Sequence, residues 1–191
     1  MINLILFGKP GSGKGTQAEF VKNKYNLKHI STGDVFRYNI SKETELGVLA
    51  KSYMEKGDLV PDNVTIKMLE AEVNNSLNAN GFIFDGFPRT TLQAEMLDEF
   101  LLSKELSITM TIALEVDENL LIDRLINRGK DSGRVDDQNR YKIQNRFNEY
   151  NKKTSTLINY YKSQNKFFKV KGSGEVREIS QRIFNVIDSN I

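Results

Sequence analysis

Residues 8–16 of the chain read GKPGSGKGT, directly after an apolar, β-prone run over residues 2–7. A glycine at position 8, four further residues and then Gly13 and Lys14 give the spacing of a phosphate-binding P-loop. The glycines let the backbone curl so that several N–H groups point at one anion, and the helix that follows adds its positive dipole end. Lys14 brings a full positive charge to the outer phosphates. The stretch predicts a buried strand, a nucleotide-phosphate cradle and a helix, rather than a glycine turn without a ligand.

One position of this motif departs from the general pattern. Gly15 follows the lysine, and the hydroxyl comes one place later, at Thr16. In most P-loop proteins a hydroxyl directly after the lysine holds magnesium. We therefore expect Mg²⁺ to be held through waters and a carboxylate, and Asp85, at the carboxyl end of a short apolar run, is the candidate.

The rest of the chain alternates between strand and helix patterns. Strands are expected over residues 2–7, 27–30, 82–84, 107–116 and 167–171. Helices are expected over residues 13–25, 62–74, 90–102, 120–128, 138–164 and 176–187, with short helices over 34–54 that are broken near Ser41 and Gly47. Asp62 is expected to cap its helix, and residues 129–137 to form a short polar loop. This order predicts an α/β fold with a five-stranded parallel sheet flanked by helices, and ligands at the carboxyl ends of the strands.

Composition narrows the class of protein. A chain of 191 residues suits one α/β domain with small insertions. The net charge of +2 does not suggest nucleic-acid binding, and the absence of cysteine excludes disulfides and cysteine-bound zinc. No apolar run approaches the length of a membrane span, and the apolar start lacks the basic leader of a signal peptide. We expect a cytoplasmic protein that binds neither nucleic acid nor membrane.

Three further segments give the chain a family resemblance. They are STGDVFR at 31–37, DGFPRTTLQ at 85–93 and DRLINRGKDSGRVDD at 123–137. Together with GKPGSGKGTQ at 8–17, they resemble, in order, the motifs of adenylate kinases, a family of P-loop nucleoside monophosphate kinases. The resemblance extends over essentially the whole chain. It implies reversible, Mg²⁺-dependent phosphoryl transfer between ATP and AMP to give two ADP, by a monomeric enzyme of adenine nucleotide homeostasis.

The resemblance implies an acceptor site for AMP. Thr32 and Arg37 are expected to grip the acceptor nucleotide, Arg89 its phosphate and Gln93 the adenine edge. Spacing supports this in part, because Arg89 and Gln93 are four residues apart on one helical face, and an amide both donates and accepts hydrogen bonds. The complete set of implied AMP-binding residues is Thr32, Arg37, Met54, Leu59, Val60, Gly86, Arg89, Gln93, Arg134 and Arg146. Met54 is nearly as compatible with core packing.

The resemblance also implies a donor site for ATP and a set of catalytic cations. The ATP-binding residues are Gly11, Ser12, Gly13, Lys14, Gly15, Thr16, Arg124, Arg128 and Gly174. The catalytic residues are Lys14, Arg89, Arg128, Arg134 and Arg146. Asp136 and Asp137 look like the pair that orients the lid arginines. The short segment 129–137 is similar to the form of the family that has no long, zinc-binding lid. Arg140 is expected to be a surface residue, and His29 to have no catalytic role.

The resemblance implies how the chain is divided into a core and two insertions, and the chemistry of the reaction implies how it is catalysed. Residues 1–191 are expected to form one P-loop kinase domain, with 32–61 as a nucleoside monophosphate-binding insertion and 125–137 as a short lid. The acceptor phosphate is already anionic near neutral pH and needs no general base. Catalysis must therefore come from positioning and from positive charge around the moving phosphoryl group. Closure of the two mobile segments would exclude water.

Three alternative functions remain at this point. A UMP or CMP kinase is the nearest, although relatives of that type tend to have alanine at the position of Thr32. A GTPase switch is disfavoured because the guanine-reading asparagine–lysine–x–aspartate motif is not found. An inactive nucleotide-binding scaffold is disfavoured by the retained lysine and arginines.

Overall fold

A computed structural model of the chain describes residues 1–132, 134–137 and 139–191. Within them a parallel sheet is formed by β1 (Ile2–Phe7), β2 (Lys28–Ser31), β3 (Gly81–Asp85), β4 (Met110–Glu115) and β5 (Phe167–Lys171). Its strand order is β2-β3-β1-β4-β5. Every neighbouring pair is parallel, with Leu4 opposite Ile83 on one side and Met110 on the other. The α/β fold with a five-stranded parallel sheet is confirmed.

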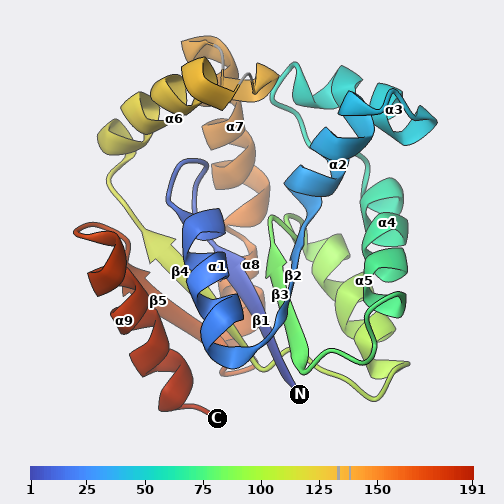
Figure 1. The fold of residues 1–191 in the computed structure, drawn as a ribbon, viewed down its shortest axis with the longest axis vertical. Coiled ribbons are helices and arrows are strands. Elements are labelled where there is room, and N and C mark those ends of the chain that lie inside the picture. Colours follow the sequence, from blue (N-terminus) through green and yellow to red (C-terminus); the bar gives the residue numbers. More distant parts are fainter. Residues whose placement is uncertain (133, 138) are drawn as a thin grey trace.

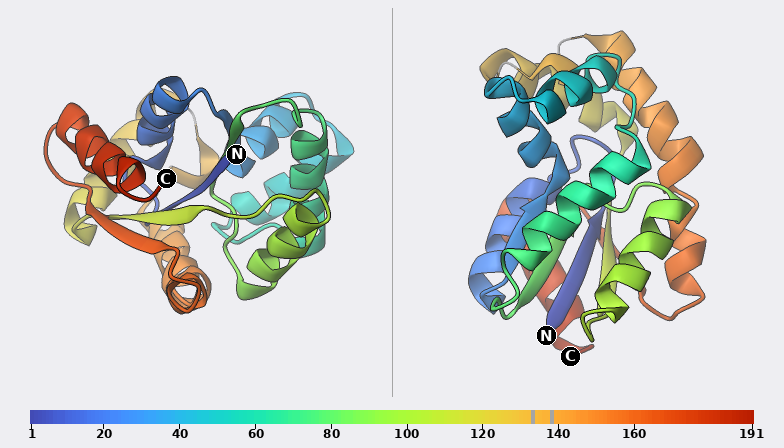
Figure 2. Two further views of the ribbon diagram at one scale, coloured as in Figure 1. Left: turned by 90° about the horizontal axis from the view of Figure 1, so that it is seen from below. Right: turned by 90° about the vertical axis from the view of Figure 1, so that its right-hand side faces the viewer.

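Helices connect the strands and cover both faces of the sheet. They are α1 (Lys14–Tyr25), α2 (Thr32–Ser41), α3 (Glu45–Met54), α4 (Asp62–Asn74), α5 (Thr91–Leu102), α6 (Glu118–Ser132), α7 (Arg140–Glu149), α8 (Leu157–Lys162) and α9 (Val176–Asp188). A 3₁₀ turn, η1, spans Val135–Asp137, and a π-helical stretch, η2, spans Tyr150–Thr154. Figure 2 shows the sheet between two layers of helices.

The central strand shows why the sheet is covered on both sides. Successive side chains of a strand point to opposite faces. Leu4 and Leu6 of β1 pack with buried residues of α1 and α9, whereas Ile5 and Phe7 pack with those of α4, α5 and α8. All four side chains are buried. A strand that is apolar on both faces is therefore fixed at the centre of the molecule, and it places the loop that follows Phe7 at the middle of one sheet edge.

Two smaller helical units stand above that edge. In Figure 1, α2 and α3 lie at the upper right and α6 with η1 at the top, beyond the carboxyl ends of the strands, whereas both chain termini lie at the opposite end. Each unit packs in a small apolar cluster: Phe36 of α2 packs with Val60, which follows α3, and Leu125 of α6 packs with Phe147 of α7. The ligand-binding end expected from the topology therefore lies between these two units.

The prediction of one continuous helix over residues 138–164 is wrong. The chain forms α7, then the π-helical stretch η2, and then α8. The buried hydroxyl of Thr154 donates a hydrogen bond to the carbonyl of Arg89, 3.0 Å away, at the point where the helical register changes. π-Helical turns inside helices are frequent at functional sites, and tertiary contacts of this kind are invisible to helical periodicity. The first residue of the predicted range, position 138, lies outside the described residues.

Two glycines that the sequence suggested as helix breaks are in fact inside helices. Helix α6 continues through Gly129 to Ser132, where a loop from 129 was predicted. A β-carbon on Gly129 would lie 2.6 Å from the carbonyl oxygen of Asp137. Similarly, Gly47 lies in the first turn of α3, where a β-carbon would lie 2.1 Å from the carbonyl oxygen of Asn39. Both glycines permit close packing and do not end a helix; the chain breaks between Ser41 and Glu45 instead.

Two smaller expectations are also corrected. The N-cap of α4 is Pro61, and Asp62 lies in the first helical turn, with its carboxylate directed to Gln93 and Thr90. The fourth strand spans Met110–Glu115 and is shorter than the predicted 107–116. Before it begins, the backbone N–H of Thr109 donates to the carbonyl of Asn3, and the side-chain amide of Asn3 donates to the carbonyl of Ser107, each at 2.8 Å.

Candidate active site

The P-loop joins β1 to α1 in a conformation that glycine permits. Gly8, Gly11 and Gly13 have φ angles of 148°, 83° and 92°, a region that side chains disfavour. The hydroxyl of Ser12 is buried without a hydrogen-bond partner. A buried polar atom without a partner is costly, so a loop of this shape is suited to receive hydrogen-bond acceptors from an anion.

Lys14 lies at the start of α1 and turns back over the loop. Its Nζ donates to the carbonyl oxygens of Gly8 at 2.7 Å and Lys9 at 3.2 Å. Burial lowers the pKa of Lys14 to about 8, with Asp85 opposing the shift and nearby arginines adding to it. A lysine in this situation gains from an additional negative charge, because an anion would stabilise its charged form.

Asp85 ends β3 beside the P-loop and is the candidate carboxylate for magnesium. Its Oδ2 is the nearest atom to the position that a β-carbon on Gly15 would occupy, at 3.7 Å. Burial raises the pKa of Asp85, but the neighbouring His29 imidazole and the charge of Lys14 outweigh it and hold the pKa below its ordinary value. The carboxylate thus lies near the place where other P-loop proteins carry a hydroxyl, and it is ionised. It fits a magnesium ion held through water.

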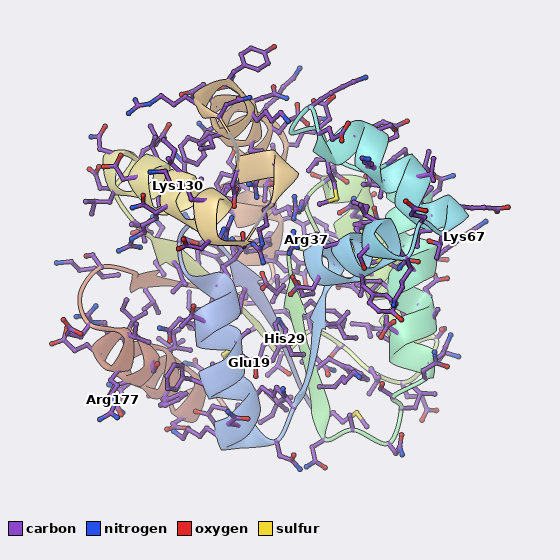
Figure 3. All side chains as sticks on the ribbon, turned by 45° about the horizontal axis from the view of Figure 1, so that its top comes forward. Glu19, His29, Arg37, Lys67, Lys130 and Arg177 are labelled. Carbon is purple, nitrogen blue, oxygen red and sulfur yellow. The ribbon has the colours of Figure 1, made fainter. Side chains whose placement is uncertain are left out.

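His29 lies between the carboxylates of Asp85 and Glu19. Its Nε2 lies 3.5 Å from Asp85 Oδ2 and its Nδ1 lies 3.2 Å from Glu19 Oε1. Figure 3 shows His29 on β2 beside Glu19 on α1. Burial lowers the pKa of His29, but the two carboxylates together raise it above its ordinary value. These contacts make His29 a partner of Asp85, and the expectation that His29 has no catalytic role stays a prediction.

A large cavity opens next to the P-loop. Its empty space, with the open solvent at its mouth included, is about 990 Å³, and it runs from Lys14 to the apolar side chains of α2, α3 and the start of α4. The predicted site residues that line it are Lys14, Thr32, Arg37, Met54, Leu59, Val60, Gly86, Arg89, Gln93 and Arg146. These residues come from segments that are far apart in the sequence, and the fold brings them together.

One end of the cavity is strongly cationic. Lys14, Arg37, Arg89 and Arg146 line it. Burial and then the charge of Arg146 lower the pKa of Arg89 to about 10, so that it remains charged at neutral pH. Arg89 is also fixed in place, because its Nε donates to the carbonyl of Gly86 at 2.7 Å. These cations are half-buried and repel one another across the cavity, and an anion bound among them would offset that repulsion.

The other end is apolar with one amide. Phe36 and Val60 are buried there, and Met54 lies beside them. Gln93 is buried and is the only carboxamide among the described residues that line the cavity. Thr32 donates from Oγ1 to the carbonyl of Gly86 at 3.0 Å, and a β-carbon on Gly86 would lie 3.1 Å from that hydroxyl oxygen. An apolar slot with a few placed polar groups is typical of a site for a ring.

Two adjacent carboxylates hold the arginines above the cavity. Asp137 is fully buried and accepts from Arg128 Nε at 2.6 Å and from Arg146. Asp136 is buried too, and its Oδ2 lies 3.0 Å from Arg146 Nη1. Arg134 lies 3.5 Å from Asp34, which also pairs with Arg37 at 2.5 Å. Figure 3 shows Arg37 on α2 facing the segment that carries these groups.

Some predicted site residues lie away from this cavity. Gly11, Ser12, Gly13, Gly15, Thr16, Asp85, Arg124, Arg128, Arg134 and Gly174 are not among the residues that line it. Arg124 is exposed on α6, and Gly174 is exposed in the loop between β5 and α9. Neither of these two residues lines the apolar slot. Arg140 is exposed, as expected.

The cavity also has lining residues that the sequence analysis missed. They are Pro10, Phe36, Asp58, Thr65, Glu149, Tyr150 and Thr154, among others. A signal was present for some of them. Phe36 follows Thr32 by four residues, and Glu149 and Tyr150 follow Arg146 by three and four, which places them on one helical face. No spacing rule could have indicated Thr154, which reaches the cavity through the π-helical stretch.

The described residues offer neither a further metal site nor a membrane-spanning helix. No group of three His, Asp or Glu side chains is arranged to hold a metal ion among residues 1–132, 134–137 and 139–191. No helix in the described part of the chain is long and apolar enough to cross a membrane.

A P-loop after the central strand of a parallel sheet, with half-buried cations around one cavity, defines a P-loop nucleotide-binding protein. Comparison with known proteins narrows this class. Residues 6–166 match the family described as adenylate kinase. The chain is 61% identical over 189 residues to the adenylate kinase of Flavobacterium psychrophilum, covering 99% of this chain and 100% of that protein. It is 56% identical to the adenylate kinase of Flavobacterium johnsoniae and 45% identical to that of Parabacteroides distasonis, each over 189 residues and 99% or more of both chains. The chain belongs to the adenylate kinase family.

Proposed function

We propose that the protein catalyses the reversible transfer of a phosphoryl group from ATP to AMP, giving two molecules of ADP. The observation that carries this proposal is the cavity itself. It has a cationic end at Lys14, Arg89 and Arg146, and an apolar end closed by Gln93. A nucleoside monophosphate has the matching shape, with an anion at one end and an apolar ring with a polar edge at the other.

The two nucleotides would meet at the P-loop. AMP would occupy the cavity, with its phosphate at Arg37 and Arg89 and its adenine at Gln93. ATP would approach from the other side, with its phosphates in the P-loop and its base near Arg124 and Gly174. An AMP phosphate oxygen then forms a bond to the γ-phosphorus as the bond from that phosphorus to the β–γ bridging oxygen breaks. One ADP forms from each nucleotide, and no general base is needed.

Catalysis would consist of positioning and charge stabilisation. Lys14, Arg128, Arg134 and Arg146 would surround the transferring group, and Asp137 would hold two of them in place. Loss of one such donor typically costs ~10²–10³ in rate. Magnesium bound to ATP adds positive charge at the phosphates, and Asp85 would hold its water ligands.

Two segments are proposed to move during turnover. Residues 32–61 would close over AMP as the monophosphate-binding insertion, and residues 125–137 over ATP as a short lid. The contact between Arg134 and Asp34 joins them, and Asn145 of α7 donates to the carbonyl of Lys56 at 2.8 Å. These contacts support a role in closure, which would keep water from the phosphoryl group.

Chromatography of the products tests the function. The protein is mixed with Mg²⁺ and ATP and, separately, with AMP, CMP, UMP or GMP. Rapid ADP formation with AMP, abolished in Lys14→Ala, is expected. Turnover mainly with CMP or UMP would overturn the assignment of the acceptor, and no transfer with ATP still bound would favour a binding scaffold. Gel filtration and cell fractionation test the monomeric state and the cytoplasmic location, which stay predictions.

A further inference from the structure

The amide of Gln93 is engaged by the protein at both of its ends. The backbone N–H of Arg89 donates to Gln93 Oε1 at 2.7 Å, and Gln93 Nε2 donates to Asp62 Oδ1 at 2.7 Å. A backbone N–H can only donate and a carboxylate can only accept. The oxygen and nitrogen of this amide, which a single side chain could exchange by a half turn, therefore have assigned positions.

Asp62 is itself held in place. Thr90 Oγ1 donates to Asp62 Oδ2 at 3.2 Å, and the same hydroxyl oxygen accepts the backbone N–H of Gln93 at 3.1 Å. Asp62 also lies in the first turn of α4, where the helix dipole favours a carboxylate. The three side chains form a closed set that links the start of α4 to the start of α5. Asp62 does not line the cavity, so it would act on a ligand only through Gln93.

The direction of the amide matters for the base it can read. Each amide has two N–H donors and two oxygen lone pairs, so Gln93 keeps one of each after the contacts described. A 6-aminopurine offers a donor at its 6-position and an acceptor at N1, whereas a 6-oxopurine offers the reverse. An amide that could rotate by a half turn would exchange its oxygen and its NH₂, and could therefore form hydrogen bonds with both kinds of ring. A turned Gln93 would set its NH₂ against the Arg89 N–H and its oxygen against the Asp62 carboxylate.

We propose that Asp62 is a specificity-determining residue: by fixing the Gln93 amide, it makes the acceptor site select 6-aminopurine over 6-oxopurine monophosphates. This inference rests on the proposed function, in which Gln93 faces the acceptor base. Asp62 is a positioning residue, and its substitution changes the choice between bases more than the rate with either. Inosine monophosphate (IMP) is the suitable probe because it differs from AMP only in the 6-position and the N1 proton.

The test is the ratio of kcat/KM for IMP to kcat/KM for AMP, measured with Mg²⁺ and ATP. In Asp62→Asn the new amide can present either its oxygen or its NH₂, so one of the two barriers to turning Gln93 is removed. The IMP-to-AMP ratio is expected to rise by about tenfold, in line with the cost of one unsatisfied buried group. Asp62→Ser, whose hydroxyl can also donate or accept, is expected to move the ratio in the same direction and serves if Asp62→Asn does not fold.

Two control variants separate this role from a structural one. Thr90→Ala removes the other hydrogen bond to the Asp62 carboxylate and the cap of α5 but keeps the carboxylate that accepts from Gln93 Nε2, so it should lower stability while changing the ratio much less than Asp62→Asn does. Gln93→Leu removes the amide that would contact the base, and should bring the ratio of kcat/KM for IMP to kcat/KM for AMP towards one. An unchanged ratio in Asp62→Asn and Asp62→Ser overturns the inference, as does an unchanged ratio in Gln93→Leu. Absence of ADP formation from AMP in the unmodified protein would instead overturn the proposed function.

Discussion

Arg134 and Asp34 lie 3.5 Å apart and join the proposed lid, residues 125–137, to the start of α2. Asp34 also binds Arg37, so one carboxylate touches an arginine from each of the two units above the sheet. Asp34 is largely exposed, and an exposed ion pair contributes only about 0–1 kcal/mol. Such a contact can bias two positions of the lid without locking either.

Substitution of Asp34 should therefore change the shape of the protein without ligand. In Asp34→Asn we expect a larger radius of gyration by small-angle scattering, because the lid loses its attraction to α2. A saturating bisubstrate analogue should return the variant to the same radius as the unmodified protein. Asp123→Asn, which removes an exposed carboxylate of α6, is the control. Equal scattering with and without the analogue in every variant would contradict closure of these segments.

The lowered pKa of Lys14 gives a pH dependence with a defined sign. Lysine is charged below its pKa, and burial brings that pKa to about 8 in the protein without ligand. Binding of tripolyphosphate should weaken as the pH rises through about 8, because the cation is lost. Calorimetric titrations between pH 6.5 and 9.5 measure this. In Lys14→Arg, which stays charged in this range, the decline near pH 8 should disappear; a decline that persists would assign it to another group.

The sequence allowed a good prediction of the elements that are fixed by local chemistry. The apolar run before Gly8 and the glycines of the P-loop determine a strand, a turn and a helix without reference to the rest of the chain. The same holds for the strand at 167–171, whose bounds were predicted correctly. The position of the cavity at the carboxyl ends of the strands followed from the α/β pattern, whereas the order of the strands within the sheet was not predicted.

What could not be predicted depends on contacts between distant segments. The sequence predicts a helix end at Gly129, but this glycine lets the backbone of Asp137 pack against α6. The sequence predicts Thr154 within a long polar helix, but its hydroxyl donates a hydrogen bond to the carbonyl of Arg89. The sequence predicts Asp62 as a helix cap, but its carboxylate accepts a hydrogen bond from Gln93. In each case the residue makes a long-range contact that local sequence patterns do not indicate.

The fully buried carboxylate of Asp137 makes a prediction about stability. It accepts from Arg128 and Arg146, and removal of one partner of a buried pair costs about 3–5 kcal/mol. Asp137→Asn keeps the shape but loses the charge, and we expect a loss of about 3 kcal/mol. For a protein of this size, that corresponds to a fall in Tm of roughly 6–12 °C. Thermal unfolding by circular dichroism measures it.

The matched control for this variant is Asp131→Asn, on the exposed end of α6. Surface substitutions usually change stability by less than about 0.5 kcal/mol, so its Tm should stay within a few degrees. The Asp137 variant should also lose activity, since Arg128 and Arg146 are no longer held. Unchanged Tm with lost activity would show that the pair serves catalysis alone and not the fold.

Replacing Gly129 with alanine should destabilise the protein, although the same replacement inside a helix usually stabilises. Replacing a glycine inside a helix with alanine normally stabilises by about 1 kcal/mol. Here a β-carbon would lie 2.6 Å from the backbone oxygen of Asp137 and 3.0 Å from its carbonyl carbon. Backbone atoms cannot turn aside as a side chain can, so Gly129→Ala must push η1 away from α6. We expect a lower Tm and, because Asp137 moves with η1, a lower kcat.

Asn127→Ala on the exposed face of the same helix isolates the effect of helix propensity. It should keep or slightly raise the Tm, because alanine is the better helix former. A rise in Tm for Gly129→Ala as well would mean that η1 can move away at no cost, and that the approach of Asp137 to α6 is loose. A fall in Tm for Gly129→Ala alone would instead tie the packing of this glycine to the position of the arginines, since the same carboxylate holds both Arg128 and Arg146.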